Sequence, residues 1–154
     1  MPSPDSEAPK TASYRLECRI GAAPERVWRA LTAEIDAWWL ADFHCAHAAS
    51  TMSLDPRPGG QLLELTAAGG GLLWYTVHAV DPGRSLTLVG PLSAGEGPGS
   101  STLQLTLSGQ DGATLLTLSD GLLGRFRDDL PERLRDGWET LLFEGLKAHA
   151  ERTA

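Results

Sequence analysis

The 154-residue sequence lacks the features that mark membrane-spanning, secreted and disulfide-bonded proteins. No run of 18 apolar residues occurs, and the first residues contain no apolar segment of signal-peptide length. Cys18 and Cys45 are the only cysteines, too few for a disulfide framework. These absences predict a soluble protein of the reducing cytoplasm that does not associate with membranes.

Basic residues are also scarce. The sequence has 20 acidic and 13 basic side chains, a formal net charge of -7, and no basic run. Nucleic acids and anionic membranes attract proteins through clustered Lys and Arg, which this sequence does not offer. The expected partner is therefore a small molecule or another protein.

The length suits one domain with one core, because a chain of this size buries roughly two thirds of its unfolded surface. Residues 1–12, with three prolines and several polar side chains, are predicted to form a flexible tail. Residues 13–151 are predicted to form the single domain.

Two different periodicities follow the tail. Apolar side chains alternate from Tyr14 to Ile20, which predicts a half-buried strand. Pro24 then suits the first turn of a helix, and Val27, Trp28 and Leu31 would share one face of it. The spacing of Ile35, Trp38 and Trp39 predicts a second short helix, and both helices should pack against a sheet.

The middle of the sequence reads as an antiparallel meander, because turn signals such as Asp111-Gly112 separate short apolar runs. The predicted strands cover residues 50–55, 61–66, 72–80, 85–89, 102–107 and 114–119. Residues 93–100 are predicted to be a mobile connection. Its tip either overhangs a cavity mouth or is an ordinary solvated loop.

A long C-terminal helix is the clearest element. Asp129, followed by Glu132 three residues later, can cap it, and its apolar stripe includes Leu130. Gly137 and Gly145 lie at one edge of that stripe, although each interior glycine costs a helix about 1 kcal/mol. We therefore expect a close neighbour there, either sheet backbone or a bound ligand.

Several segments, in this order, resemble those of a known family. They are APERVWRALT, the pair Trp38-Trp39, PRPGG, VDPGRSL, ATLLTLSDGL and DGWETLL. Over roughly residues 14–150 the sequence is similar to the START-like, or SRPBCC, superfamily, in the branch named after the activator of the heat-shock-protein-90 ATPase. Where many relatives carry a histidine, this sequence has Asp120, which predicts an anion in place of a group that titrates near neutrality.

The resemblance implies an α+β helix-grip fold. In this fold a curved antiparallel sheet of six or seven strands has two short helices at one end, and the long C-terminal helix crosses its concave face. It also implies a deep apolar pocket between the sheet and that helix. It does not fix a function, because members include lipid carriers, polyketide cyclases and cochaperones.

Strand alternation and the helix stripe together predict which side chains face this pocket. The predicted ligand-binding residues are Leu65, Trp74, His78, Leu88, Leu105, Leu118, Asp120, Leu134, Trp138, Leu141 and Leu142. Each leucine, and Trp138, could instead simply fill the core. His78 could be a hydrogen-bonded core residue, a ligand anchor or a general base.

Other kinds of chemistry find little support. His44, Cys45 and His47 are close in sequence, but no paired Cys/His cluster completes a zinc site. The sequence has no GxSxG motif, and Gly69–Gly71 is not followed by the Lys-Ser/Thr pair of a phosphate loop. No metal, nucleotide or covalent cofactor is predicted.

Three functional hypotheses follow. The first is binding of an apolar or aromatic small molecule in the cavity. The second is a cyclase or hydrolase in which His78, with or without Asp120, moves a proton. The third is a cochaperone-like module that uses its outer surface. A homodimer formed through an exposed edge strand is possible in any of these.

Overall fold

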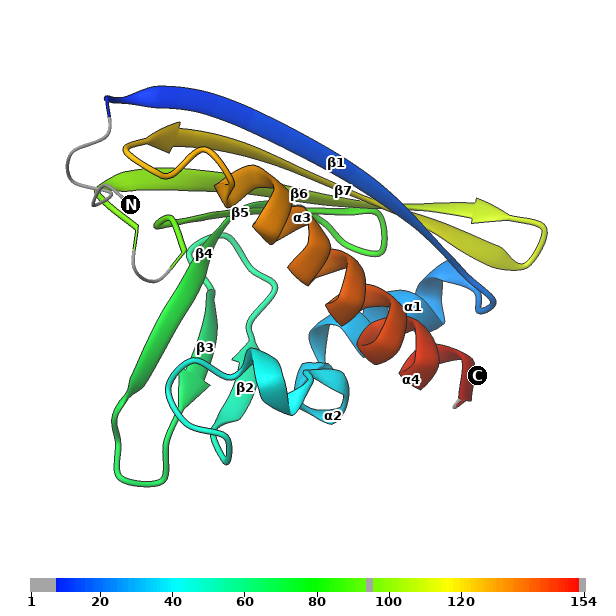
Figure 1. The fold of residues 1–154 in the computed structure, drawn as a ribbon. Coiled ribbons are helices and arrows are strands. Elements are labelled where there is room, and N and C mark those ends of the chain that lie inside the picture. The colour runs from blue at the N-terminus through cyan, green and yellow to red at the C-terminus, as the bar shows by residue number, and fades with distance from the viewer. Residues whose placement is uncertain (1–7, 94–95, 153–154) are drawn as a thin grey trace.

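The computed structural model describes residues 8–93 and 96–152. A curved antiparallel sheet forms one layer, and a long C-terminal helix lies across its concave side (Figure 1). The strands are β1 (Lys10–Ile20), β2 (Thr51–Leu54), β3 (Gln61–Leu65), β4 (Gly71–Asp81), β5 (Ser85–Gly90), β6 (Gly99–Gln110) and β7 (Ala113–Gly124). Their order is β1-β7-β6-β5-β4-β3-β2, so β1 and β2 are the edges. This arrangement confirms the predicted α+β helix-grip fold.

The helices fall into two groups. α1 (Pro24–Thr32), α2 (Ile35–Trp38) and the 3₁₀ turn η2 (Ala41–Phe43) connect β1 to β2. The long C-terminal helix consists of α3 (Leu130–Thr140), a π-helical stretch η3 (Leu141–Lys147) and α4 (Ala148–Arg152). Pro24 starts α1 as predicted, at a position where its missing N–H costs no hydrogen bond.

The first strand starts earlier than predicted. Lys10 pairs with Gly124 of β7, and the next two residues continue the ladder, although the sequence placed the flexible tail up to residue 12. The backbone of β7 provides hydrogen-bond partners for residues 10–12, so this polar segment is ordered even though it buries little apolar surface. Residues 1–7 of the predicted tail lie outside the described residues.

The hairpin between β6 and β7 confirms the Asp111-Gly112 signal. Asp111 has φ 52° and Gly112 has φ 80°, and Gln110 pairs with Ala113 on either side of them. Two successive positive φ angles match the right-handed twist of the flanking strands, which is why Asp-Gly favours this turn.

The start of the last helix differs in detail from the prediction. Asp129 does occupy the N-cap position, but its side chain makes no capping hydrogen bond. Its carboxylate instead pairs with Arg133 Nε at 3.2 Å, one turn along the helix. Asp129 therefore forms an ion pair on the helix surface in place of a capping hydrogen bond.

One half of the C-terminal helix closes the hydrophobic core. Side chains of η3 and α4 pack with α1, α2 and the leucines of β5, β6 and β7. At Gly145 an added Cβ would lie 2.6 Å from the Trp38 carbonyl oxygen. The close neighbour expected there is thus helix backbone rather than sheet backbone. Trp38 itself donates its indole N–H to the Ala30 carbonyl at 2.7 Å.

Strand β3 presents the opposite face from the one predicted. Leu62 and Glu64 are buried, whereas Leu65 is 46% exposed. Simple alternation placed Leu65 on the inner face of the sheet. The prediction of Leu65 as a pocket residue is therefore wrong.

Strand β4 is irregular at two residues, and both were predicted pocket residues. Against β3 the register steps from Tyr75 to Leu73, which leaves Trp74 as an extra residue. Against β5 it steps from Val77 to Ala79, which leaves His78 as an extra residue. Bulges of this kind redirect side chains away from strict alternation.

Candidate functional site

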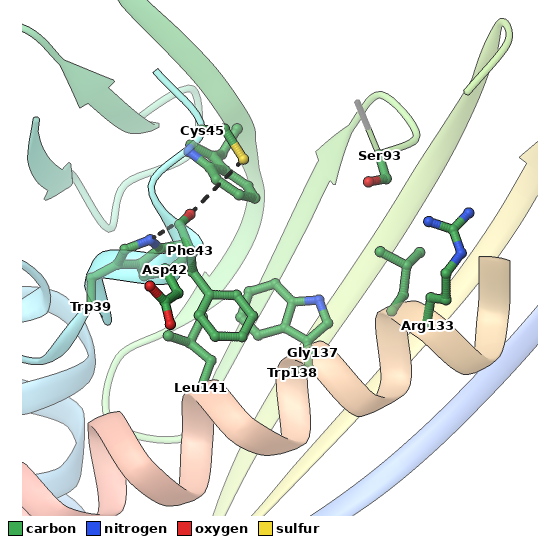
Figure 2. A pocket seen from close by; sticks show the side chains of 11 residues that line it. Trp39, Asp42, Phe43, Cys45, Ser93, Arg133, Gly137, Trp138 and Leu141 are labelled. Atoms are coloured by element: carbon green, nitrogen blue, oxygen red, sulfur yellow. Dashed lines mark hydrogen bonds between the residues drawn. The ribbon is translucent and has the colours of Figure 1, made fainter. Parts of the chain in front are cut away.

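Two adjoining pockets lie between the N-terminal half of the long helix, strand β4 and the segment after α2. Their volumes are about 210 and 230 Å³. The first is lined by Trp39, Asp42, Phe43, Cys45, Trp74, Ser93, Arg133, Leu134, Gly137, Trp138 and Leu141 (Figure 2). The second is lined by Cys45, Leu72, Leu73, Trp74, Tyr75, Pro91, Leu92, Ser93, Ser101, Leu134 and Trp138. Side chains common to both lists, including Trp74, Leu134 and Trp138, form a shared wall.

Three tryptophans give the pockets an aromatic wall. The Trp39 ring lies 5.3 Å from that of Trp74 and 6.1 Å from that of Trp138, at interplanar angles of 70° and 88°. These edge-to-face contacts hold the rings in fixed orientations. Trp39 donates its indole N–H to the Phe43 carbonyl at 3.2 Å. Its polar group is thereby satisfied within the protein.

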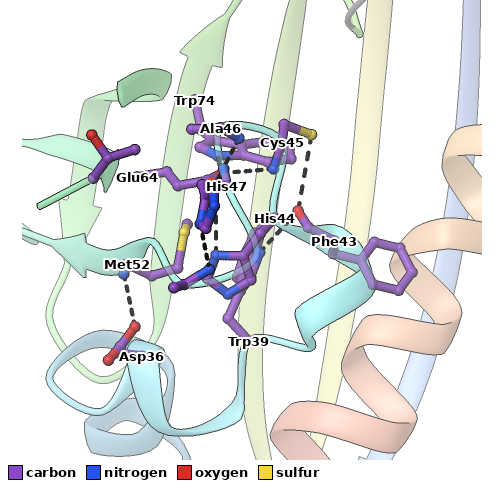
Figure 3. A network of polar contacts seen from close by, with 12 residues as sticks. Asp36, Trp39, Phe43, His44, Cys45, Ala46, His47, Met52, Glu64 and Trp74 are labelled. Atoms are coloured by element: carbon purple, nitrogen blue, oxygen red, sulfur yellow. Dashed lines mark hydrogen bonds and ion pairs between the residues drawn. The ribbon is translucent and has the colours of Figure 1, made fainter. Parts of the chain in front are cut away.

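The buried carboxylate of Glu64 fixes the segment at the pocket mouth (Figure 3). Its side chain has no exposed surface. Oε1 accepts the Cys45 N–H at 3.0 Å and the Trp74 indole N–H at 2.9 Å. Oε2 accepts the N–H groups of Ala46 at 2.7 Å and His47 at 3.4 Å. Glu64 therefore positions both Trp74 and Cys45.

The ionised state of Glu64 follows from these donors. Burial raises the pKa of the Glu64 carboxyl, but three backbone N–H groups and the Trp74 indole N–H outweigh it and lower the pKa to about 2. A buried carboxylate needs such compensation, because an unpaired charge away from water is costly. The negative charge is thus used to order a loop.

His44 of this loop lies beside the Glu64 carboxylate. The His44 side chain is only 6% exposed, and its Nδ1 lies 3.6 Å from Glu64 Oε2 without a hydrogen-bond partner. In the described part of the chain, no group of three His, Cys, Asp or Glu side chains is arranged to hold a metal ion.

A chain of hydroxyl groups leads from the second pocket to Asp120. Tyr75 and Ser101 both line this pocket, and their hydroxyl oxygens lie 3.0 Å apart. Ser101 Oγ donates to Asp120 Oδ1 at 2.7 Å, and Tyr14 donates to Oδ2 at 2.6 Å. Asp120 therefore lies behind the pocket wall, linked to it through Ser101.

Burial changes the pKa of each titratable side chain in this hydrogen-bonded series, namely Tyr14, Tyr75 and Asp120. It raises the pKa of Asp120, while the hydroxyls of Tyr14 and Ser101 and the Gly121 N–H act in the opposite direction. Burial and the nearby Asp120 both raise the pKa of Tyr14 and of Tyr75 above that of a free tyrosine. Both phenols are therefore protonated near neutral pH.

The predicted site residues separate into those that line the pockets and those that do not. Trp74, Leu134, Trp138 and Leu141 line them. Four predicted leucines are buried in the core instead, namely Leu88, Leu105, Leu118 and Leu142. For these four, the alternative of core filling describes their position.

The placement of His78 is a correction. Its side chain is exposed to solvent, whereas Tyr75 and Val77 of the same strand are buried. His78 is the extra residue at the second irregularity of β4, which the prediction of uninterrupted alternation did not include. The enzyme hypothesis used His78 as a base inside the pocket, so it loses the residue on which it depended.

Several pocket residues were not predicted from the sequence. Tyr75 and Ser101 lay on faces or in segments that alternation did not assign to the pocket, and Phe43 lies in a region with few periodic cues. Gly137 gave a partial signal. It lines the first pocket, and an added Cβ there would lie 3.5 Å from the Phe43 ring, an ordinary contact.

Comparison with known proteins agrees with this architecture. Residues 21–151 match the family model described as activator of Hsp90 ATPase homolog 1-like protein. An uncharacterized protein of Rhizobium leguminosarum has a similar structure, with a TM-score of 0.73 and 22% identity over 95% of this chain and 98% of the other. Protein MLL2253 of Mesorhizobium loti is also similar, with a TM-score of 0.68 and 25% identity over 93% of this chain and 99% of the other.

CalU16 of Micromonospora echinospora is a further neighbour, with a TM-score of 0.60 and 21% identity over 92% of this chain and 81% of the other. None of the curated proteins matches the sequence. No helix in the described residues is long and apolar enough to cross a bilayer. The protein belongs to the activator of Hsp90 ATPase homolog 1-like family, within the START-like (SRPBCC) superfamily.

Proposed function

We propose that the protein binds a small apolar or aromatic molecule in the two pockets between the sheet and α3. The aromatic wall is the observation that carries this proposal. The indole N–H groups of Trp39 and Trp74 are bonded to Phe43 and Glu64, so these rings can offer carbon surface to a ligand at little further desolvation cost. The family has a ligand-binding type of fold, which supports the same role.

The volumes indicate the size of the ligand. Each pocket, at about 210 or 230 Å³, is smaller than the roughly 300–1,000 Å³ of sites for drug-sized molecules. A molecule of one or two fused rings fits such a space. A longer molecule would lie along the shared wall and occupy both pockets. Removal of its apolar surface from water supplies the driving force, at about 25 cal/mol per Å².

We also propose a cytoplasmic location. Cys18 and Cys45 are both free, and Cys18 is buried in the core. Burial raises the pKa of the Cys18 thiol to about 11, so it is present as the unreactive thiol. Free cysteines are usual in proteins of reducing compartments.

A thermal-shift screen tests the binding proposal, with variants in which a larger side chain fills a pocket. The probes are naphthalene, indole, 2-naphthol and a medium-chain alcohol. Leu134→Phe enlarges a side chain on the shared wall, and Leu134→Met is its control because it nearly conserves volume. Gly137→Leu fills the first pocket only, and Gly137→Ala is its control.

The wild-type protein and both control variants should be stabilised by at least one ring compound, because binding to the folded state raises the melting temperature. Leu134→Phe should respond to none. Gly137→Leu should lose the response to any compound held in the first pocket. The proposal is wrong if no compound shifts the wild type, or if Leu134→Phe responds as fully as Leu134→Met.

A further inference from the structure

We propose that the ligand carries a hydrogen-bond donor, a hydroxyl or N–H group on an aromatic or apolar body, which bonds to the Tyr75 hydroxyl oxygen in the second pocket. This inference rests on the proposed binding function. It adds the polarity of the ligand, which the apolar lining alone does not specify.

Asp120 accepts a hydrogen bond on each of its two carboxylate oxygens. Its side chain is 3% exposed and accepts one hydroxyl on each oxygen, from Ser101 at 2.7 Å and from Tyr14 at 2.6 Å. A carboxylate is an acceptor only, so both hydroxyl hydrogens point toward it. Two such bonds satisfy both oxygens of a carboxylate that has almost no access to water.

The direction of the next bond follows from counting protons. Ser101 has one hydroxyl hydrogen, and Asp120 receives it. Towards Tyr75 Oη, 3.0 Å away, Ser101 Oγ can therefore act only as an acceptor. Tyr75 donates its single hydrogen to Ser101, and what remains on Tyr75 Oη is a lone pair.

Tyr75, which lines the second pocket, thus has a hydroxyl that is committed as an acceptor. The walls around it are mainly apolar, including Leu72, Leu92 and Trp138. A ligand hydroxyl or N–H gains a bond to Tyr75 Oη. An ether or ketone oxygen at the same place sets a lone pair against a lone pair and gains nothing. One such bond changes affinity roughly 3- to 10-fold.

Three matched probes measure this preference by titration calorimetry. Naphthalene has no polar group, 2-naphthol adds a donor, and 2-methoxynaphthalene replaces the donor with an acceptor. For the wild type, we expect 2-naphthol to bind roughly 3- to 10-fold more tightly than naphthalene. We expect 2-methoxynaphthalene to bind no more tightly than naphthalene.

Variants along the chain make the test specific. In Tyr75→Phe the advantage of 2-naphthol should vanish while naphthalene still binds. In Ser101→Ala the Tyr75 hydrogen loses its acceptor and becomes free for the ligand, so 2-methoxynaphthalene should gain over naphthalene. Tyr14→Phe is the control, because Tyr14 bonds the far oxygen of Asp120 and does not line the pocket. It should keep the wild-type preference.

The outcomes separate the two proposals. Equal binding of all three probes to the wild type, or tighter binding of 2-methoxynaphthalene than of 2-naphthol, would overturn the donor inference and leave the binding function intact. Binding of none of them would contradict the binding function, and the donor inference with it. Loss of the 2-naphthol preference in Tyr14→Phe would also count against the inference, since the effect would then not depend on the pocket wall.

Discussion

The two halves of the C-terminal helix face the same sheet but have different neighbours. The half made by η3 and α4 packs on α1 and α2, and its side chains Leu142, Leu146 and Ala150 have no exposed surface. The half made by α3 contacts β1 and lines the pockets opposite β4 and the segment after α2, and its side chains Leu134 and Trp138 are only partly buried. One amphipathic helix thus closes a core at one end and forms a pocket wall at the other.

The difference shows that the apolar stripe of a helix does not by itself determine whether the stripe contacts core or ligand. The neighbours determine it. At the closed half, two helices fill the space over the sheet. At the open half, a loop ordered by Glu64 and the irregular strand β4 leave a gap lined with aromatic rings.

The largest predicted effect is on the closed half. Leu142→Ala should lower the free energy of unfolding by about 3 to 4 kcal/mol, because it creates a cavity in a closed core. The matched change Leu134→Ala in the open half should cost about 1 kcal/mol, since this side chain is only partly buried. Urea denaturation measures both. Equal losses would contradict the distinction between the two halves.

The next effect concerns the carboxylate that orders the pocket mouth. Glu64→Gln conserves the shape but removes the charge that accepts four N–H groups, and should cost about 2 kcal/mol at pH 7. Urea denaturation compared with the wild type measures this cost. Intrinsic fluorescence should change as well, because Trp74 loses a charge-assisted hydrogen bond.

The stability difference between the wild type and Glu64→Gln should also depend on pH. The folded-state pKa of Glu64 is about 2, below its ordinary value of 4.5. Its contribution to stability is therefore fully present above pH 4.5 and is lost as the pH falls from 4.5 to 2, because the unfolded state takes up the proton first. The gap between wild type and Glu64→Gln should narrow across this range. A gap that stays constant down to pH 2 would exclude this role of Glu64.

The two helix glycines give the smallest effects, with opposite signs. Gly145→Ala places a methyl group 2.6 Å from the Trp38 carbonyl oxygen, and should destabilise the protein by about 1 to 2 kcal/mol despite the better helix propensity of alanine. Gly137→Ala meets only the Phe43 ring at 3.5 Å, and should stabilise it by up to about 1 kcal/mol. Thermal unfolding distinguishes the pair. Stabilisation by both would mean that the closed half has space to spare.

The sequence predicted the closed parts of the molecule better than the open part. The predicted inward leucines of β5, β6 and β7, Leu88, Leu105 and Leu118, are buried, because these strands pair without interruption and alternation survives. At Leu65 and His78 the same rule gave the wrong face. Extra residues in β4 and an inward-facing Glu64 changed which side chains reach the interior.

The failure at Glu64 has a physical reason that local pattern does not contain. A carboxylate flanked by leucines normally faces water, and this one faces inward because backbone N–H groups from residues 45–47 and the Trp74 indole compensate its charge. These donors lie 10 to 19 positions away in the sequence. Tyr75 and Ser101 were missed because their pairing also depends on the fold.

The most direct test of the account uses the five tryptophans as reporters. Two-dimensional NMR of ¹⁵N-labelled protein resolves each indole N–H, and naphthalene is added in steps. The account predicts shifts for Trp39, Trp74 and Trp138, which line the pockets, and little change for Trp28 and for Trp38, whose N–H is bonded to Ala30. No shift at any indole, or shifts confined to Trp28 and Trp38, would contradict it.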